Sequence, residues 1–116
     1  MSNTYDVGDQ VTLGNPTTAV NSRMPTTVEP FKNSAGTATD PSQVKLKVLS
    51  PSGTTTTYTW PTPGAGESQL TRETTGRFYA NISITAAGVW TYQLKGTGTI
   101  EAMEEGVLSV RTPAIT

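Results

Sequence analysis

Three glutamates near the end of the chain, Glu101, Glu104 and Glu105, form its only acidic cluster. Paired carboxylates act as general acid and general base when a cleft drives their pKa values apart. Carboxylates beside a strand at the edge of a small sandwich are normally solvated instead. We therefore expect these three residues to lie on the surface, and we assign them no catalytic role.

The aspartates Asp6, Asp9 and Asp40 stand near the ends of expected strands, where a Ca²⁺ ion would find several oxygen ligands. Their spacing matches no calcium-binding loop. Asp is common in turns because its side chain bonds the nearby backbone. We predict turn roles for all three aspartates, and so neither a metal site nor a cofactor.

Serine and threonine hydroxyls are plentiful, but the sequence contains no histidine and no cysteine. A serine nucleophile needs a base to activate it, and histidine is the usual base. The absence of histidine therefore excludes the usual triad, and we predict that the chain is not an enzyme.

Two aromatic residues, Tyr58 and Trp60, indicate a binding chemistry, because exposed rings can stack on sugar rings. Together with the Pro/Gly loop at 61–67 they form a candidate glycan site, although we favour packing of both rings in the core. Lys45 and Lys47 point away from the apolar face of their strand. We expect them to protect a sheet edge against unwanted strand pairing.

The elements that position these residues are strands. A glycine opens each of two segments, 77–84 and 89–96, in which apolar residues alternate with polar ones. Such alternation is typical of half-buried antiparallel strands. The segments are joined by Thr85-Ala86-Ala87-Gly88, so we expect them to be adjacent strands of a small β-sandwich.

Other patterns predict the remaining strands, for a total of seven or eight, and 44–48 is the clearest strand of the front half. We expect them at about 9–14, 26–32 (with Pro30 implying an edge or bulge), 44–48, 54–60, around Leu70 and at 107–111. Within 44–48, Val44, Leu46 and Val48 share the apolar face. The expected core aromatics are Phe31, Trp60, Phe78, Trp90 and Tyr92.

Composition agrees with one all-β domain over residues 1–116. Hydrophobic residues make up only 34% and charged residues 15%, while about a fifth of the chain is threonine, which favours strands. With a net charge of −1 and no basic cluster, we expect no nucleic-acid partner. No apolar run is long enough to span a bilayer, so we expect no membrane contact.

Residues 14–27 are polar and contain proline, without a sustained pattern. They predict either a surface loop or an extended arm that orders against a neighbouring subunit. The C-terminal residues 111–116 allow the same two interpretations.

The segment Gly88-Val89-Trp90-Thr91-Tyr92 is similar to the corner that opens the F strand of immunoglobulin-like (Ig-like) domains. It departs from that pattern at two positions, with Ala86 in place of an acidic residue and Tyr92 in place of the disulfide cysteine. The resemblance therefore implies a cysteine-free Ig-like sandwich of about seven strands.

A longer series of segments resembles small Ig-like proteins encoded among the structural genes of tailed bacteriophages, notably those of actinobacterial hosts. In chain order the segments are 5–9, 31–36, 40–41, 44–48, 51–54, 75–79, 88–92, 96–98 and 104–107. The resemblance implies a virion component at the head surface or the head–tail junction.

From this resemblance we expect a capsid (head) decoration protein, made in the host cytoplasm and located in the virion. It would dock on the major capsid protein in a symmetric assembly. Two alternatives stay open: a neck, head–tail connector or tail-associated protein, and a glycan-binding adhesion module.

Overall fold

The computed structural model describes residues 4–17 and 29–112. No helix in this part of the chain is long and apolar enough to cross a membrane. Nine strands form there: β1 (Thr4–Asp6), β2 (Gln10–Gly14), β3 (Gln43–Leu49), β4 (Thr55–Trp60), β5 (Ser68–Gln69), β6 (Thr71–Thr74), β7 (Arg77–Ser83), β8 (Gly88–Thr97) and β9 (Ala102–Arg111).

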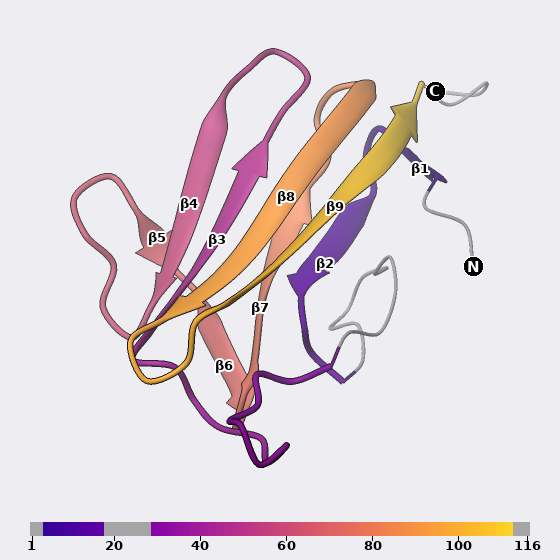
Figure 1. Cartoon of the computed structure of the whole chain (residues 1–116). Helices are drawn as coiled ribbons and strands as arrows, with labels where there is room; N and C mark the ends of the chain where they lie inside the picture. Colours follow the sequence, from indigo (N-terminus) through magenta and orange to yellow (C-terminus); the bar gives the residue numbers. More distant parts are fainter. Residues whose placement is uncertain (1–3, 18–28, 113–116) are drawn as a thin grey trace.

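The strands build two sheets that pack face to face (Figure 1). One has six strands in the order β1-β9-β8-β3-β4-β5, and the other has three in the order β2-β7-β6. Only the β1–β9 and β4–β5 pairs are parallel among the described strands. The predicted cysteine-free β-sandwich is confirmed. It has nine strands instead of about seven. The prediction missed β1 and β5, because both are too short to show an alternating pattern.

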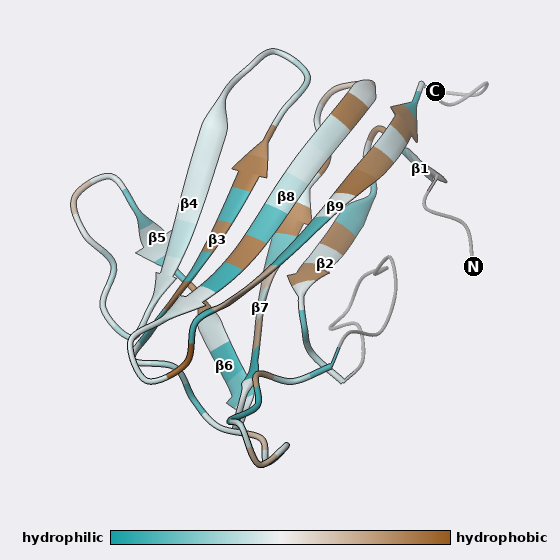
Figure 2. Cartoon of the chain, in the orientation of Figure 1, coloured by the Kyte–Doolittle hydropathy of each residue, from teal (hydrophilic) through white to brown (hydrophobic). Residues whose placement is uncertain are grey.

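The core lies between the sheets, where every second residue of a strand points inward. On β3, Val44, Leu46 and Val48 are at most 3% exposed, as their alternation predicted. The apolar face of β7 is likewise buried from Phe78 to Ile82. Figure 2 shows the resulting alternation as brown bands on β3, β8 and β9. Full burial of each such side chain contributes about 1.5–3 kcal/mol.

The two glycine-led strands lie where they were predicted, but they are not neighbours in one sheet. β7 belongs to the three-stranded sheet and β8 to the six-stranded sheet. At the end of β7, Ile84 exchanges backbone hydrogen bonds with the turn between β1 and β2, while Gly88 pairs with Val110 of β9. The connecting turn therefore crosses from one sheet to the other.

The strand predicted at 26–32 is wrong in its described part. Residues 29–31 form no strand, and Lys32 makes only an isolated bridge to Ala38. Phe31 instead donates its backbone N–H to Gly76 O and inserts a buried ring beside Phe78, at a ring-centroid distance of 6.0 Å. Residues 26–28 lie outside the described part.

The other predicted strands are confirmed within a few residues, with two differences. Leu70 is buried, but it lies between β5 and β6 and not in a strand. The closing strand starts at Ala102 and not near 107, because β9 pairs with β8 along its whole length as far as Gly96. Residues 102–105 are exposed on both faces, so no alternation marks them.

The aromatic core is confirmed in part. Phe31, Phe78 and Trp90 are buried, whereas Trp60 and Tyr92 are half-buried and pack against the core from its edge. A further large buried side chain, Tyr5 on β1, was not among the predicted core residues.

Residues 14–17 are the described part of 14–27, for which a loop or an arm is predicted; Gly14 ends β2, and residues 15–17 form no strand. Asn15 is only 1% exposed, and its side chain bonds Gly76 O and Phe78 N in the three-stranded sheet. Thr17 donates its backbone N–H and its hydroxyl to the Glu73 carboxylate. Residues 18–27 and 113–116 lie outside the described residues, so the arm prediction there stays a prediction.

Candidate functional site

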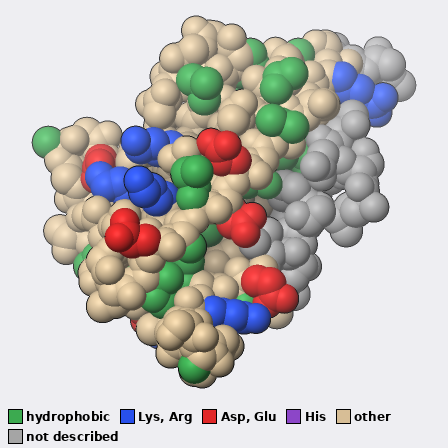
Figure 3. Space-filling model, viewed as in Figure 1, with side chains coloured by type: hydrophobic (Ala, Val, Ile, Leu, Met, Phe, Trp, Pro, Cys, Tyr) green, Lys and Arg blue, Asp and Glu red, His purple; other side chains and the backbone are tan. Residues whose placement is uncertain are grey.

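The six-stranded sheet has an inner face toward the core and an opposite face, called here the outer face. The side chains of the outer face come from the alternate positions of β3, β8 and β9 that do not point into the core. Figure 3 views the molecule from this side and shows hydrophobic, basic and acidic side chains on one broad surface.

Four large hydrophobic residues, Leu49, Val89, Met103 and Val107, are between 40% and 59% exposed. Strand register places all four on the outer face. Leu49 and Val107 stand in one row with Thr91 between them, and Val89 lies in the next row opposite Ser109. The exposed large hydrophobic residues of the described chain therefore gather on one face, as at protein–protein contacts.

Basic residues occupy the neighbouring rows of the outer face. Lys45 lies directly opposite Lys95, and Lys47 lies opposite Gln93. Gln93 in turn donates an amide hydrogen bond of 3.0 Å to Glu105 on β9. The face thus has an apolar end, and at its other end three lysines stand beside Met103, which lies opposite Lys95, and Glu105, which lies opposite Gln93.

Lys45 is fixed by a 2.7 Å ion pair with Glu67, which closes the loop at 61–67. The Gly64 backbone N–H and the Thr59 hydroxyl donate to the same carboxylate, each at 2.8 Å. These bonds, led by the one from Lys45, lower the pKa of Glu67 to about 2. The loop is therefore held by an ionised carboxylate at neutral pH.

The edge-protection role predicted for Lys45 and Lys47 is wrong. Their strand, β3, pairs with β4 on one side and with β8 on the other, so it lies inside the sheet. Both lysines do point away from the apolar face, as predicted.

The glutamate cluster does not converge on a site. Glu101, Glu104 and Glu105 are all exposed. Glu104 and Glu105 are successive residues of β9 and point to opposite faces of the sheet, so they cannot act as a pair.

Asp6 and Asp9 stand at the two ends of one turn, and Asp40 lies elsewhere. Asp9 accepts the backbone N–H of Asp6 at 2.9 Å across the turn between β1 and β2. Asp40 instead binds the Arg72 guanidinium at 2.9 Å and the Gly76 N–H at 2.8 Å. Nowhere in residues 4–17 and 29–112 do three acidic side chains form a group suited to a metal ion.

The candidate glycan residues do not form an exposed aromatic platform. Trp60 is half-buried and tilts against Phe78, with 4.9 Å between the ring centroids. Tyr58 is also half-buried, and its burial raises the pKa of its phenol. Both rings pack against the core, which was the favoured interpretation of the sequence.

Sequence reasoning missed the outer face as a site. Leu49, Val89 and Val107 stand at positions that alternate with core residues, where polar side chains are normal. Apolar residues at both sets of positions were the available signal.

Comparisons with protein-family models, with curated proteins and with solved structures found no match for this chain.

Proposed function

We propose that this chain is a structural protein of a tailed-bacteriophage virion, and that it decorates the capsid by docking on the major capsid protein. The observation that carries the proposal is the gathering of exposed hydrophobic side chains on the outer face. The order of segments described for the sequence supports the phage context.

In this proposal the outer face is the docking surface. Leu49, Val89 and Val107 lose contact with water on binding, which supplies the non-directional part of the affinity. Lys47 and Lys95 orient the protein toward acidic side chains of the capsid. Because a capsid repeats each surface many times, one such face per chain is sufficient for many copies to bind.

The test adds purified protein to particles of the encoding phage that lack it and measures the bound amount as a function of concentration. Val107→Lys places a charge in the apolar end of the face. We expect at least about tenfold weaker binding, the equivalent of about 1.4 kcal/mol.

Thr71→Lys is the matched control, because it adds the same charge at an exposed position on the three-stranded sheet. It should bind like the parent. Equal binding by both variants would exclude the outer face as the docking surface. Failure of the parent to bind would contradict the virion proposal, and saturation at a few copies would favour the neck or tail.

A further inference from the structure

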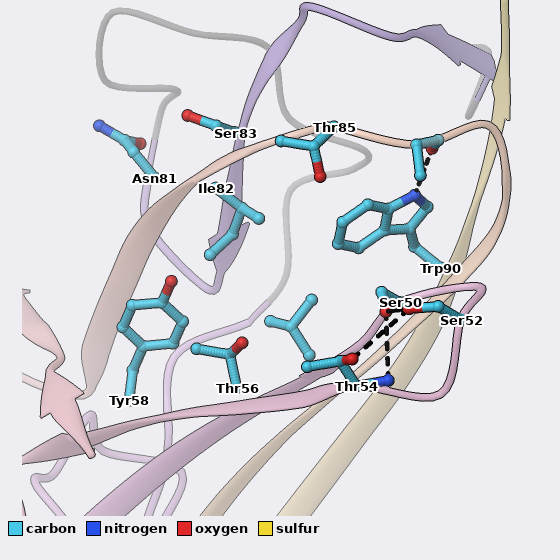
Figure 4. A pocket seen from close by; sticks show the side chains of 12 residues that line it. Ser50, Ser52, Thr54, Thr56, Tyr58, Asn81, Ile82, Ser83, Thr85 and Trp90 are labelled. Atoms are coloured by element: carbon cyan, nitrogen blue, oxygen red, sulfur yellow. Dashed lines mark hydrogen bonds between the residues drawn. The ribbon is translucent and has the colours of Figure 1, made fainter. Parts of the chain in front are cut away.

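A groove of about 500 Å³ opens between β4 and β7, on the side of the sandwich away from β9. It lies over the inner face of the six-stranded sheet, at a place that the narrower three-stranded sheet does not cover. Figure 4 shows Tyr58 and Thr56 rising from β4 on one side and Ile82 of β7 on the other, with Trp90 at one end. The volume is within the range of ligand-binding clefts, about 300–1,000 Å³.

Two incompletely paired strands border this groove. β6 pairs with β7 only at Arg77–Tyr79, so the second half of β7 has β2 as its one strand neighbour among the described residues. β5 pairs with β4 only at Tyr58 and Thr59, which leaves the first half of β4 at the sheet edge.

The cause of both open edges is the path of the chain around Leu70. Residues 68–69 pair with β4 in one sheet, and residues 71–74 pair with β7 in the other. Leu70 itself donates its backbone N–H to Thr59 O at 3.0 Å. Since the chain changes sheet at this point, it provides no strand for the second half of β7.

The backbone of β7 directs hydrogen-bonding groups toward the groove. Phe78 O and Ile84 N bond to the segment that contains β2, so the even-numbered residues face β2. In an antiparallel pair the intervening residues point their N–H and C=O groups the other way. The N–H and C=O of Ser83 therefore point to the open edge.

The lining is uncharged and has an apolar floor. Val48 and Ile82 contribute aliphatic surface, and the Trp90 ring is held by its indole N–H, which donates to Ala86 O at 2.9 Å. Ser50, Ser52 and Thr54 bond one another at the rim. None of the lining residues is Asp, Glu, Lys or Arg, and burial raises the pKa of the Tyr58 phenol, so the lining has no charge at neutral pH with which to neutralise a charged ligand.

We propose that this groove binds an extended, uncharged peptide segment of a partner protein, which adds as a strand to the open edge of β7. Main-chain hydrogen bonds to β7 supply affinity, and alternate small apolar side chains of the peptide rest on Val48, Ile82 and Trp90. The hydrogen bonds form at the Ser83 N–H and C=O, and a peptide strand of about four residues, at about 3.3 Å each, spans the part of β7 beyond Tyr79, the last residue paired with β6. The proposal concerns a different surface from the outer face and does not depend on a virion.

The test uses the full-length ¹⁵N-labelled protein and a capped heptapeptide in which valine alternates with serine or threonine. We expect saturable shifts of the Ile82 and Ser83 amide signals, with a Kd of about 5 mM or tighter. Exchange of the Ser83 amide proton should slow when the peptide is bound, because a strand-like hydrogen bond protects it.

Two variants of β4 provide a matched pair. Thr56→Arg directs a long charged side chain into the groove and should weaken peptide binding at least tenfold. Thr55→Arg changes the preceding residue, which lies on the outer face, and should leave binding within twofold of the parent. Both threonines are exposed, so both variants should fold.

The proposal is overturned if the peptide causes no saturable shift, or if the two variants weaken binding equally. It is also overturned if the Ser83 amide exchanges at an unchanged rate in the bound state. A shift of the same signals by maltotriose and not by the peptide would identify a sugar site instead. None of these outcomes affects the capsid-binding test.

Discussion

Asn15→Ala tests how the described N-terminal segment is held to the sandwich. The Asn15 side chain is buried, and its Nδ2 donates to Gly76 O at 2.9 Å and to Glu29 O at 3.2 Å. Its Oδ1 accepts the backbone N–H of Phe78 at 2.8 Å. One amide thus links the end of β2, the segment that precedes Phe31, and the turn between β6 and β7.

The expected loss follows from which partners stay satisfied. In the alanine variant the buried Phe78 N–H has no acceptor, which costs about 1–3 kcal/mol. Gly76 O keeps its bond from the Phe31 N–H, so the bond lost there costs only about 0.5–1.5 kcal/mol. The Glu29 carbonyl is partly exposed and can bond water. We expect the free energy of unfolding to fall by about 2–4 kcal/mol.

The assay is equilibrium unfolding in urea, followed by tryptophan fluorescence and circular dichroism. Asn33→Ala is the matched control, since the Asn33 carboxamide also bonds the backbone, at Ala35 and Thr37, but in an exposed turn. Its loss should stay below about 1 kcal/mol. The reasoning is refuted if Asn15→Ala destabilises the protein no more than Asn33→Ala does.

Three other changes test the turns, the loop and the core. Gly76→Ala should destabilise the protein more than Gly53→Ala. Both glycines have positive φ, which costs alanine about 1–2 kcal/mol at either position. Of the two, only Gly76 would also place the new Cβ 2.8 Å from a backbone oxygen. Equal urea midpoints for the two variants would contradict this difference. The pKa of Glu67 is lowered from 4.5 to about 2, so its contribution to stability is present above pH 4.5 and is lost as the pH falls toward 2. Glu67→Gln should therefore show a smaller loss of unfolding free energy over that interval, and an unchanged loss would contradict a contribution of the Glu67 carboxylate to stability. Trp90→Ala should cost about 3–5 kcal/mol in urea unfolding, and a loss below about 1 kcal/mol would show that the ring is not part of the core.

The strands that could be predicted from the sequence are those with one buried face. Alternation at Val44, Leu46 and Val48 is local, so it identifies β3 and its inward residues without knowledge of the partner strands. The same holds for β7 and β8. That β7 and β8 belong to different sheets depends on distant pairings, such as that of Gly88 with Val110. Local alternation contains no information about which strands pair.

The exposed outer face, the burial of Asn15 and the groove could not be predicted from local sequence patterns. Alternation identifies the buried face of a strand but does not say whether the opposite face is covered, so the exposure of Val89 and Val107 was not predicted. Asn15 is a polar residue in a polar segment, and nothing local distinguishes it from an exposed loop residue. The groove exists because the chain changes sheet at Leu70, which is a property of the topology.

If the proposed function is right, a phage genome encodes this protein, and the most direct test is the copy number of the protein in purified particles of that phage. Quantitative mass spectrometry gives that number relative to the major capsid protein. A capsid decoration protein should be present at about one copy per capsid subunit, or one per few subunits. A handful of copies per particle would contradict the decoration role and favour the neck or tail, and absence from the particles would contradict the virion role itself.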